Sequence, residues 1–196
     1  RVCAVRQCRW RRITEMNSGW GHHNTIAGKR LYRPRQNAGQ GPFVRGKAMT
    51  AIERLYFEDV AVGDQFVGAT VAVEREELLW FARNFDNQPM HTDPAAARAM
   101  GLEDIIAPGC YTFALNSKSI HVIWNRLHFL PSGRDIALCL LKPLYAGGTL
   151  TTYVEIGGKR ESSKPVRGWL DAKVTCRDGD DRAIATVDAS WLLKRR

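Results

Sequence analysis

The second part of the chain alternates between two hydrophobic patterns, one typical of helices and one typical of strands. Apolar residues recur at helical spacing over Glu74–Asn84, behind acidic residues that suit a first helical turn. A second helix is expected over Pro108–Trp124. This segment is apolar or small on nearly every side, so we expect the helix to be buried.

Strand-like segments surround these helices. Short turns, Ala146-Gly147-Gly148 and Asp178-Gly179-Asp180-Asp181, separate some of them, and a polar linker, Glu161–Pro165, separates others. One buried helix followed by a meander of long strands predicts an α+β fold in which an antiparallel sheet wraps around the central helix. The expected strands are Phe66–Val73, Ile136–Tyr145, Thr149–Lys159, Gly168–Arg177 and Ala183–Leu193.

Candidate catalytic residues lie in the segment Asp86-Asn87-Gln88-Pro89-Met90-His91, which the hydrophobic pattern does not account for. Pro89 lacks an N–H group and disfavours helical geometry at the residue before it, so the segment is expected to bend. A bend can turn Asp86 and His91 towards one water molecule as a general acid/base pair. The alternative is structural, with an Asp that caps a helix and a His that holds the turn. Asp93 is expected to cap a further short helix that begins at Pro94.

The composition is that of an ordinary globular protein, with 44% hydrophobic and 25% charged residues among 196. No apolar run approaches the roughly 20 residues that span a bilayer, so no membrane partner is expected. The five cysteines include no CxxC pair, which argues against a disulfide framework or a zinc site. These features favour a reducing, cytoplasmic setting.

The net charge of +9 is concentrated in residues 1–48, which hold eleven Lys and Arg residues and a single acid, Glu15. Residues 49–196 have a formal charge near −1, which argues against nucleic acid as a partner. We expect 1–48 to be a disordered basic extension and 49–196 to be one domain. The extension could be an organelle-targeting peptide, a binding arm or translated upstream sequence. We favour the last, because Met49 opens a self-contained domain.

Four further features of the sequence point to a family. They are Tyr56-Phe57-Glu58-Asp59 with Val62-Gly63, the segment Asp86–Asp93, Ile106-Ala107-Pro108-Gly109, and Lys142–Gly147 with Lys159–Pro165. With these features the chain resembles, over residues 55–193, the MaoC-like dehydratases, the (R)-specific enoyl-CoA hydratase family, which has a single hotdog fold. Two residues depart from the family's pattern: Gln88 stands in place of a commoner Asn, and Pro108 stands where many members have His.

The resemblance implies a hydro-lyase that adds water reversibly across the double bond of a 2-enoyl thioester. Asp86 and His91 would hold and activate the water. The Gly109 amide, at the start of the buried helix, would stabilise the thioester oxygen, and Ser117 would orient the acid. No metal or redox cofactor is implied, since a CoA or acyl-carrier-protein thioester is the substrate. The family also implies a homodimer whose sheets pair edge to edge.

Other functions remain open at the level of sequence. A hotdog thioesterase would attack the carbonyl carbon, usually with a lone helix carboxylate and no Asp–Pro–His bend. A non-catalytic acyl-binding subunit would be expected to have lost the acid or the histidine, and both are present. A nucleic-acid binder would work through residues 1–48 and would bind more weakly as salt rises.

Overall fold

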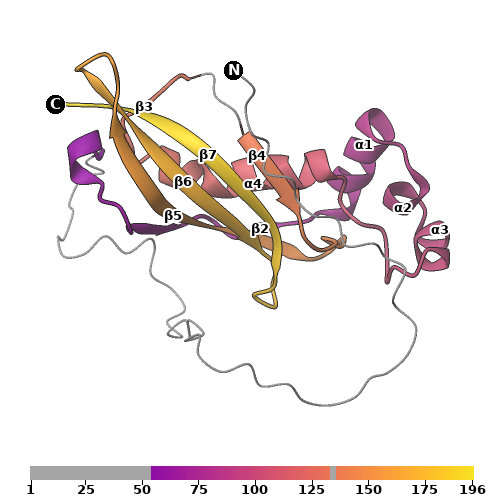
Figure 1. Ribbon diagram of the computed structural model, residues 1–196. Helices are drawn as coiled ribbons and strands as arrows, with labels where there is room; N and C mark the ends of the chain where they lie inside the picture. Colours follow the sequence, from indigo (N-terminus) through magenta and orange to yellow (C-terminus); the bar gives the residue numbers. More distant parts are fainter. Residues whose placement is uncertain (1–53, 133–135) are drawn as a thin grey trace, which may run out of the picture. The chain divides into compact units, whose positions relative to one another are not determined.

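The computed structural model describes residues 54–132 and 136–196, in which one long helix lies against an antiparallel sheet (Figure 1). The predictions made for residues 1–48 lie outside this part of the chain. The helices are α1 (Arg75–Phe85), α2 (Pro89–Thr92), α3 (Pro94–Ala99) and α4 (Gly109–Trp124), preceded by a 3-10 turn, η1 (Phe57–Asp59). The strands are β1 (Gln65–Val67), β2 (Val71–Ala72), β3 (Phe129–Leu130), β4 (Ile136–Leu140), β5 (Thr149–Glu161), β6 (Arg167–Arg177) and β7 (Ala183–Lys194).

The long strands β5, β6 and β7 form the centre of the sheet, whose order is β1-β5-β6-β7-β3. β2 pairs with β5 and β4 pairs with β7, and every pairing is antiparallel. Along β6 every second residue is buried, as expected for a sheet with one covered face. The α+β prediction is therefore confirmed.

Helix α4 covers the inner face of the sheet and supplies much of the core. Its buried residues Leu115, Ile120 and Ile123 share clusters with inner-face residues such as Val174 and Leu150. Burial of each such side chain contributes about 1.5–3 kcal/mol. The prediction of a buried helix beginning at Pro108-Gly109 and ending near Trp124 is confirmed.

The prediction of a single strand over Phe66–Val73 is wrong, because the strand is interrupted between β1 and β2. At the interruption, Ser119 of α4 forms the hydrogen bonds to the backbone. Its Oγ donates to the Ala69 carbonyl (2.6 Å) and accepts from the Thr152 amide (3.0 Å). The Ser119 carbonyl also accepts from the Ala69 amide at 2.9 Å. Gly68 permits this close approach, since a Cβ there would lie 2.6 Å from the Ser119 carbonyl oxygen.

The strand expected to run from Ile136 to Tyr145 ends earlier, at Leu140. The amides of Leu141 and Lys142 both donate to the Ile184 carbonyl, which breaks the ladder with β7, and Pro143 has no amide to continue it. The chain then turns to pair Tyr145 with Ile106. In contrast, β5 extends past its expected end at Lys159 to Glu161, so it takes up the first residue of the expected linker.

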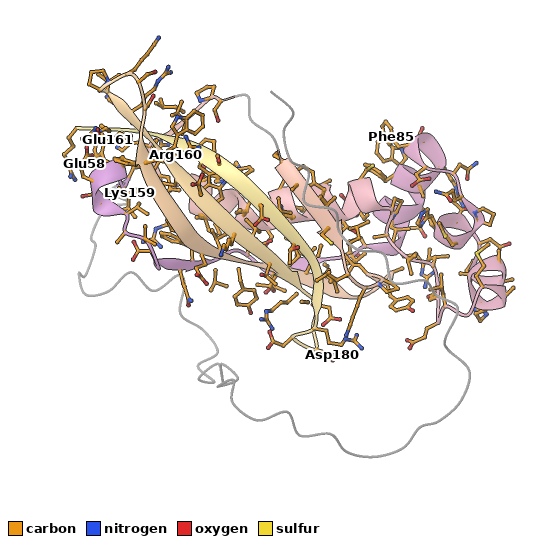
Figure 2. All side chains as sticks on the ribbon, viewed as in Figure 1. Glu58, Phe85, Lys159, Arg160, Glu161 and Asp180 are labelled. Atoms are coloured by element: carbon orange, nitrogen blue, oxygen red, sulfur yellow. The ribbon has the colours of Figure 1, made fainter. Side chains whose placement is uncertain are left out.

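Helices α1, α2 and α3 gather beyond one end of the sheet (Figure 1). Phe85, the last residue of α1, projects outward there, whereas Glu58, Lys159, Arg160 and Glu161 gather at the other end (Figure 2). Asp93 caps α3 as expected, because its Oδ1 accepts from the Ala95 amide at 2.8 Å. The bend that follows α1 therefore lies apart from the charged end of the sheet.

Candidate active site

The bend between α1 and α3 brings Asp86 and His91 together. Asp86 is the C-terminal cap residue of α1, and its amide donates to the Ala82 carbonyl at 2.8 Å. Its backbone is not helical, with φ −155° and ψ 71°. Pro89 then opens the single turn α2, which contains His91. The chain bends as Pro89 predicts, although the sequence pattern did not reveal the helical turn within the bend.

The two side chains face each other just beyond direct hydrogen-bond distance. Asp86 Oδ2 lies 3.6 Å from His91 Nε2, which is too long for a good direct hydrogen bond. The His91 side chain is only 5% exposed and that of Asp86 28% exposed, so the gap is sheltered but reachable. The structure therefore brings the expected acid and histidine together.

A second contact defines which nitrogen of His91 carries a proton. His91 Nδ1 lies 2.8 Å from the Ile106 carbonyl oxygen, which can only accept. Nδ1 must therefore donate, and in the neutral imidazole Nε2 carries the lone pair. Asp86 Oδ2 and His91 Nε2 are then both acceptors, and each can take one hydrogen of the same water.

Gln88 holds the other oxygen of the carboxylate. Its side-chain amide donates to Asp86 Oδ1 at 2.7 Å, and its backbone amide donates to the Asp86 carbonyl at 2.8 Å. One Asp86 oxygen is thus occupied while Oδ2 faces His91. Sequence reasoning singled out Gln88 only as a departure from a family pattern and missed this contact. Its place inside the bend was the available signal.

The segment Ile106–Gly109 connects His91 to the start of α4. Beyond its bond to His91, Ile106 donates its amide to the Met90 carbonyl, and Ala107 donates to the Leu144 carbonyl. Gly109 is the first residue of α4, so its amide has no carbonyl partner within the helix. Leu140 covers this glycine, and a Cβ at Gly109 would lie 2.8 Å from Leu140 Cδ1. At most about 11 Å of chain separates Gly109 from Ile106, whose carbonyl contacts His91.

Ser117 makes a different contact from the one expected. Its Oγ donates to the Phe113 carbonyl at 3.2 Å, one turn back in the same helix, and the oxygens of Asp86 contact Gln88 and His91 instead. The expectation that Ser117 bonds to the acid is therefore not met in this structure. Ser117 lines a cavity beside α4.

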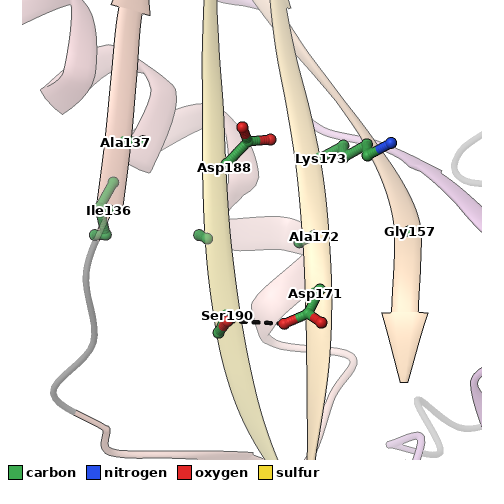
Figure 3. Close-up of a pocket in the computed structure, with 9 residues that line it drawn as sticks. Ile136, Ala137, Gly157, Asp171, Ala172, Lys173, Asp188 and Ser190 are labelled. Atoms are coloured by element: carbon green, nitrogen blue, oxygen red, sulfur yellow. Dashed lines mark hydrogen bonds between the residues drawn. The ribbon is translucent and has the colours of Figure 1, made fainter. Parts of the chain in front are cut away.

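This cavity, of about 210 Å³, lies between α4 and the inner face of the sheet. Phe113, Ser117, Ile120 and Trp124 recur at helical spacing along it, and Ile136 of β4 closes one side. A wider hollow of about 480 Å³ is lined by charged residues such as Asp171, Lys173 and Asp188 (Figure 3). The wider hollow includes none of the expected site residues, so the apolar cavity is the better candidate for an acyl chain.

Tyr111 lies near Gly109 but does not suit proton transfer. Its ring is buried against Phe81, with ring centroids 5.0 Å apart. Burial and the nearby Glu77 carboxylate raise the pKa of Tyr111 to about 12. The phenol is therefore protonated and only weakly acidic at neutral pH, and we assign it no step.

Among residues 54–132 and 136–196, no three or more His, Cys, Asp and Glu side chains are grouped so as to hold a metal ion. Within the same ranges, no helix has the length and apolar character needed to cross a membrane.

Comparison with known families matches residues 59–176 to the model described as "MaoC like domain". This chain belongs to the MaoC-like family. The match covers the bend, α4 and most of the sheet. The α+β architecture of this MaoC-like chain is accordingly that of the hotdog fold, as the sequence resemblance implied.

Individual relatives of this MaoC-like chain agree with the assignment. A MaoC-like dehydratase from Rhodospirillum rubrum superimposes with a TM-score of 0.66 at 26% identity, covering 72% of this chain and 98% of that one. The R-hydratase PhaJ1 from Pseudomonas aeruginosa shares the fold at 21% identity, with a TM-score of 0.57, covering 73% of this chain and 88% of that one. Protein YdeM from Bacillus subtilis is 29% identical over 145 residues, 70% of this chain and 98% of its own length.

Pro108, the second departure from the commoner MaoC-like pattern, is the N-terminal cap residue of α4. Its backbone is extended, with φ −53° and ψ 150°, and its side chain makes no capping hydrogen bond. Its carbonyl accepts from the Thr112 amide at 2.9 Å, as the first bond of the helix. Pro108 therefore begins the helix without obstructing the Gly109 amide.

Proposed function

We propose that this chain catalyses the reversible addition of water to a 2-enoyl thioester, as a hydro-lyase of the (R)-specific enoyl-CoA hydratase type. The observation that carries the proposal is the pair of acceptors, Asp86 Oδ2 and His91 Nε2, which face each other at 3.6 Å. The substrate is a CoA or acyl-carrier-protein thioester, so the reaction requires no metal or redox cofactor.

The reaction begins with a water that donates one hydrogen to each acceptor. Such a water directs its lone pair away from both groups and towards the β-carbon of the enoyl chain. One acceptor removes a proton as the carbon–oxygen bond forms, and a proton is returned to the α-carbon. The bond from His91 Nδ1 to the Ile106 carbonyl orients the ring throughout, with Nε2 directed at Asp86. His91 is therefore well suited to carry the proton from water to carbon.

Negative charge collects on the thioester oxygen while water adds. In this proposal the Gly109 amide donates to that oxygen, and the positive end of the α4 dipole favours the same charge. Loss of one such donor typically costs about 2.7–4 kcal/mol of transition-state stabilisation. The acyl chain then runs along α4 past Ser117 into the apolar cavity, where Ser117 contributes to the wall.

The proposal includes a homodimer that forms through β4. This edge strand leaves Ile136, Leu138 and Leu140 between 38% and 53% exposed. Exposed apolar residues on an edge strand favour pairing with another strand. Leu140 also covers Gly109, so a second copy at this edge would border the site.

A hydration assay with variants tests the function. The wild-type protein is mixed with crotonyl-CoA and longer or branched 2-enoyl-CoAs, and the loss of enoyl absorbance and the chirality of the product are followed. Asp86→Asn and His91→Ala should each lower kcat by at least about 100-fold, the contribution expected from general acid/base catalysis. Wild-type rates in either variant would show that the site is misassigned.

Asp93→Asn is the matched control, because Asp93 lies in the same segment and its carboxylate caps α3. Asn caps helices about as well as Asp, so this variant should keep its activity and its melting temperature. Release of free CoA without hydration would instead indicate a thioesterase and would refute the proposal.

A further inference from the structure

Asn116 is a polar side chain inside the apolar cavity that the proposed reaction does not use. It is 5% exposed and lines the cavity on the side of α4 that carries Ile120. Its Oδ1 accepts from Thr152 Oγ1 at 2.9 Å and from Cys176 Sγ at 3.4 Å. Among the residues that the structure describes, its side-chain NH₂ group donates no hydrogen bond, and the residue lines the cavity.

The orientation of this amide follows from its partners. Burial raises the pKa of the Cys176 thiol to about 11, so the sulfur carries its hydrogen at neutral pH and can donate it. The hydroxyl of Thr152 also has a hydrogen to donate. Two donors therefore meet Oδ1, which turns the NH₂ group away from them.

Asn116 also lies at a defined depth beside the proposed acyl path. It follows Gly109 by about 10 Å along α4, so a thioester held at Gly109 would bring the middle or distal acyl chain to the amide. A plain hydrocarbon chain would exclude other acceptors from this NH₂ group and would supply none of its own. A buried donor left without an acceptor is costly, and sites built to bind a polar group discriminate against analogues that lack it.

We infer that the cavity takes an acyl chain with a hydrogen-bond-accepting oxygen, such as a ketone, at the depth of Asn116. The inference rests on the proposed function, because it places the thioester at Gly109. The remaining walls are mainly apolar, with Phe113, Ile120 and Trp124 on α4. The rest of the acyl chain is therefore mainly hydrocarbon, although the indole N–H of Trp124 also lacks a partner there.

Binding of unreactive ligands tests this inference separately from catalysis. Calorimetry would compare a saturated medium-chain acyl-CoA with a series of equal length that carries one ketone at successive positions. The wild-type protein should bind one member of the series at least about tenfold more tightly than the plain chain. Equal or weaker binding of every ketone would overturn the inference.

A double variant, Asn116→Leu with Thr152→Val, attributes the preference to the amide. Replacing Asn116 and Thr152 together leaves only the weak S–H donor of Cys176 without its acceptor, so the fold should be kept. The variant should lose the preference for the ketone, whereas Asn125→Leu, at the exposed end of the same helix, should retain it. A preference that survives in the double variant would also overturn the inference. If neither ligand type is hydrated in its enoyl form, the proposed reaction fails, while the binding ratios still decide the role of Asn116.

Discussion

At the scale of single residues, Gln88 is the contact that most directly sets the geometry of the acid. Its amide holds Asp86 Oδ1 at 2.7 Å, which leaves Oδ2 directed at His91. Gln88→Leu should lower kcat about tenfold with little change in KM, since a hydrogen bond to a charged group contributes about 1.5–3 kcal/mol. Steady-state kinetics measure kcat and KM separately for the variant and the wild type.

Asn87→Ala is the control for this prediction, because Asn87 is an exposed neighbour within the same bend. Its kinetics should match those of the wild type. A loss of melting temperature in Gln88→Leu with an unchanged kcat would mean that Gln88 is structural, and the positioning role would then be wrong.

The residue scale also shows what sequence could and could not predict about the site. Pro89 has a strong and local backbone effect, so the bend and the meeting of Asp86 with His91 could be predicted. The partner of Ser117 could not be predicted, because its hydroxyl can donate either to a carbonyl in its own helix or to a more distant acid, and the sequence favours neither. The unpaired amide of Asn116 depends on Thr152 and Cys176, which are distant in sequence.

At the scale of elements, the break between β1 and β2 depends on the fit of Gly68 against Ser119. Gly68→Ala should lower the free energy of unfolding by about 1–3 kcal/mol, because the new methyl group would press on backbone that cannot move aside easily. Gly157→Ala is a matched control within the sheet, since its nearest neighbour is the flexible end of Lys173 at 3.1 Å. Urea denaturation measures both variants. Equal stabilities would show that the close approach at Gly68 imposes no constraint.

The length of an element determines how well the sequence pattern predicts it. Helices α1 and α4 and strands β5, β6 and β7 are long enough for their hydrophobic period to mark them, so their positions could be predicted to within a few residues. The short strands β2 and β3 contain too few residues to show a period. The early end of β4 depends on the Ile184 carbonyl, which no local pattern reveals.

At the scale of the whole molecule, the exposed apolar face of β4 predicts self-association. Leu138 and Leu140, 38% and 53% exposed, pair with Val187 and Ala185 of β7, and no other strand of the described residues pairs with β4. Leu138→Lys should convert a dimer into a monomer, because a charge at the centre of an edge strand opposes strand pairing. Light scattering on the purified protein measures the mass of each form.

Val166→Lys is the matched control, since Val166 is 62% exposed and lies between β5 and β6, away from β4. It should leave the mass unchanged. The monomeric Leu138→Lys variant should also hydrate enoyl-CoA more slowly, because Leu140 of the same strand covers Gly109 and loses its support when the edge is unpaired. A variant with the mass of the wild type would refute assembly through β4. A fully active monomer would show instead that the site between Asp86, His91 and Gly109 is complete within one chain.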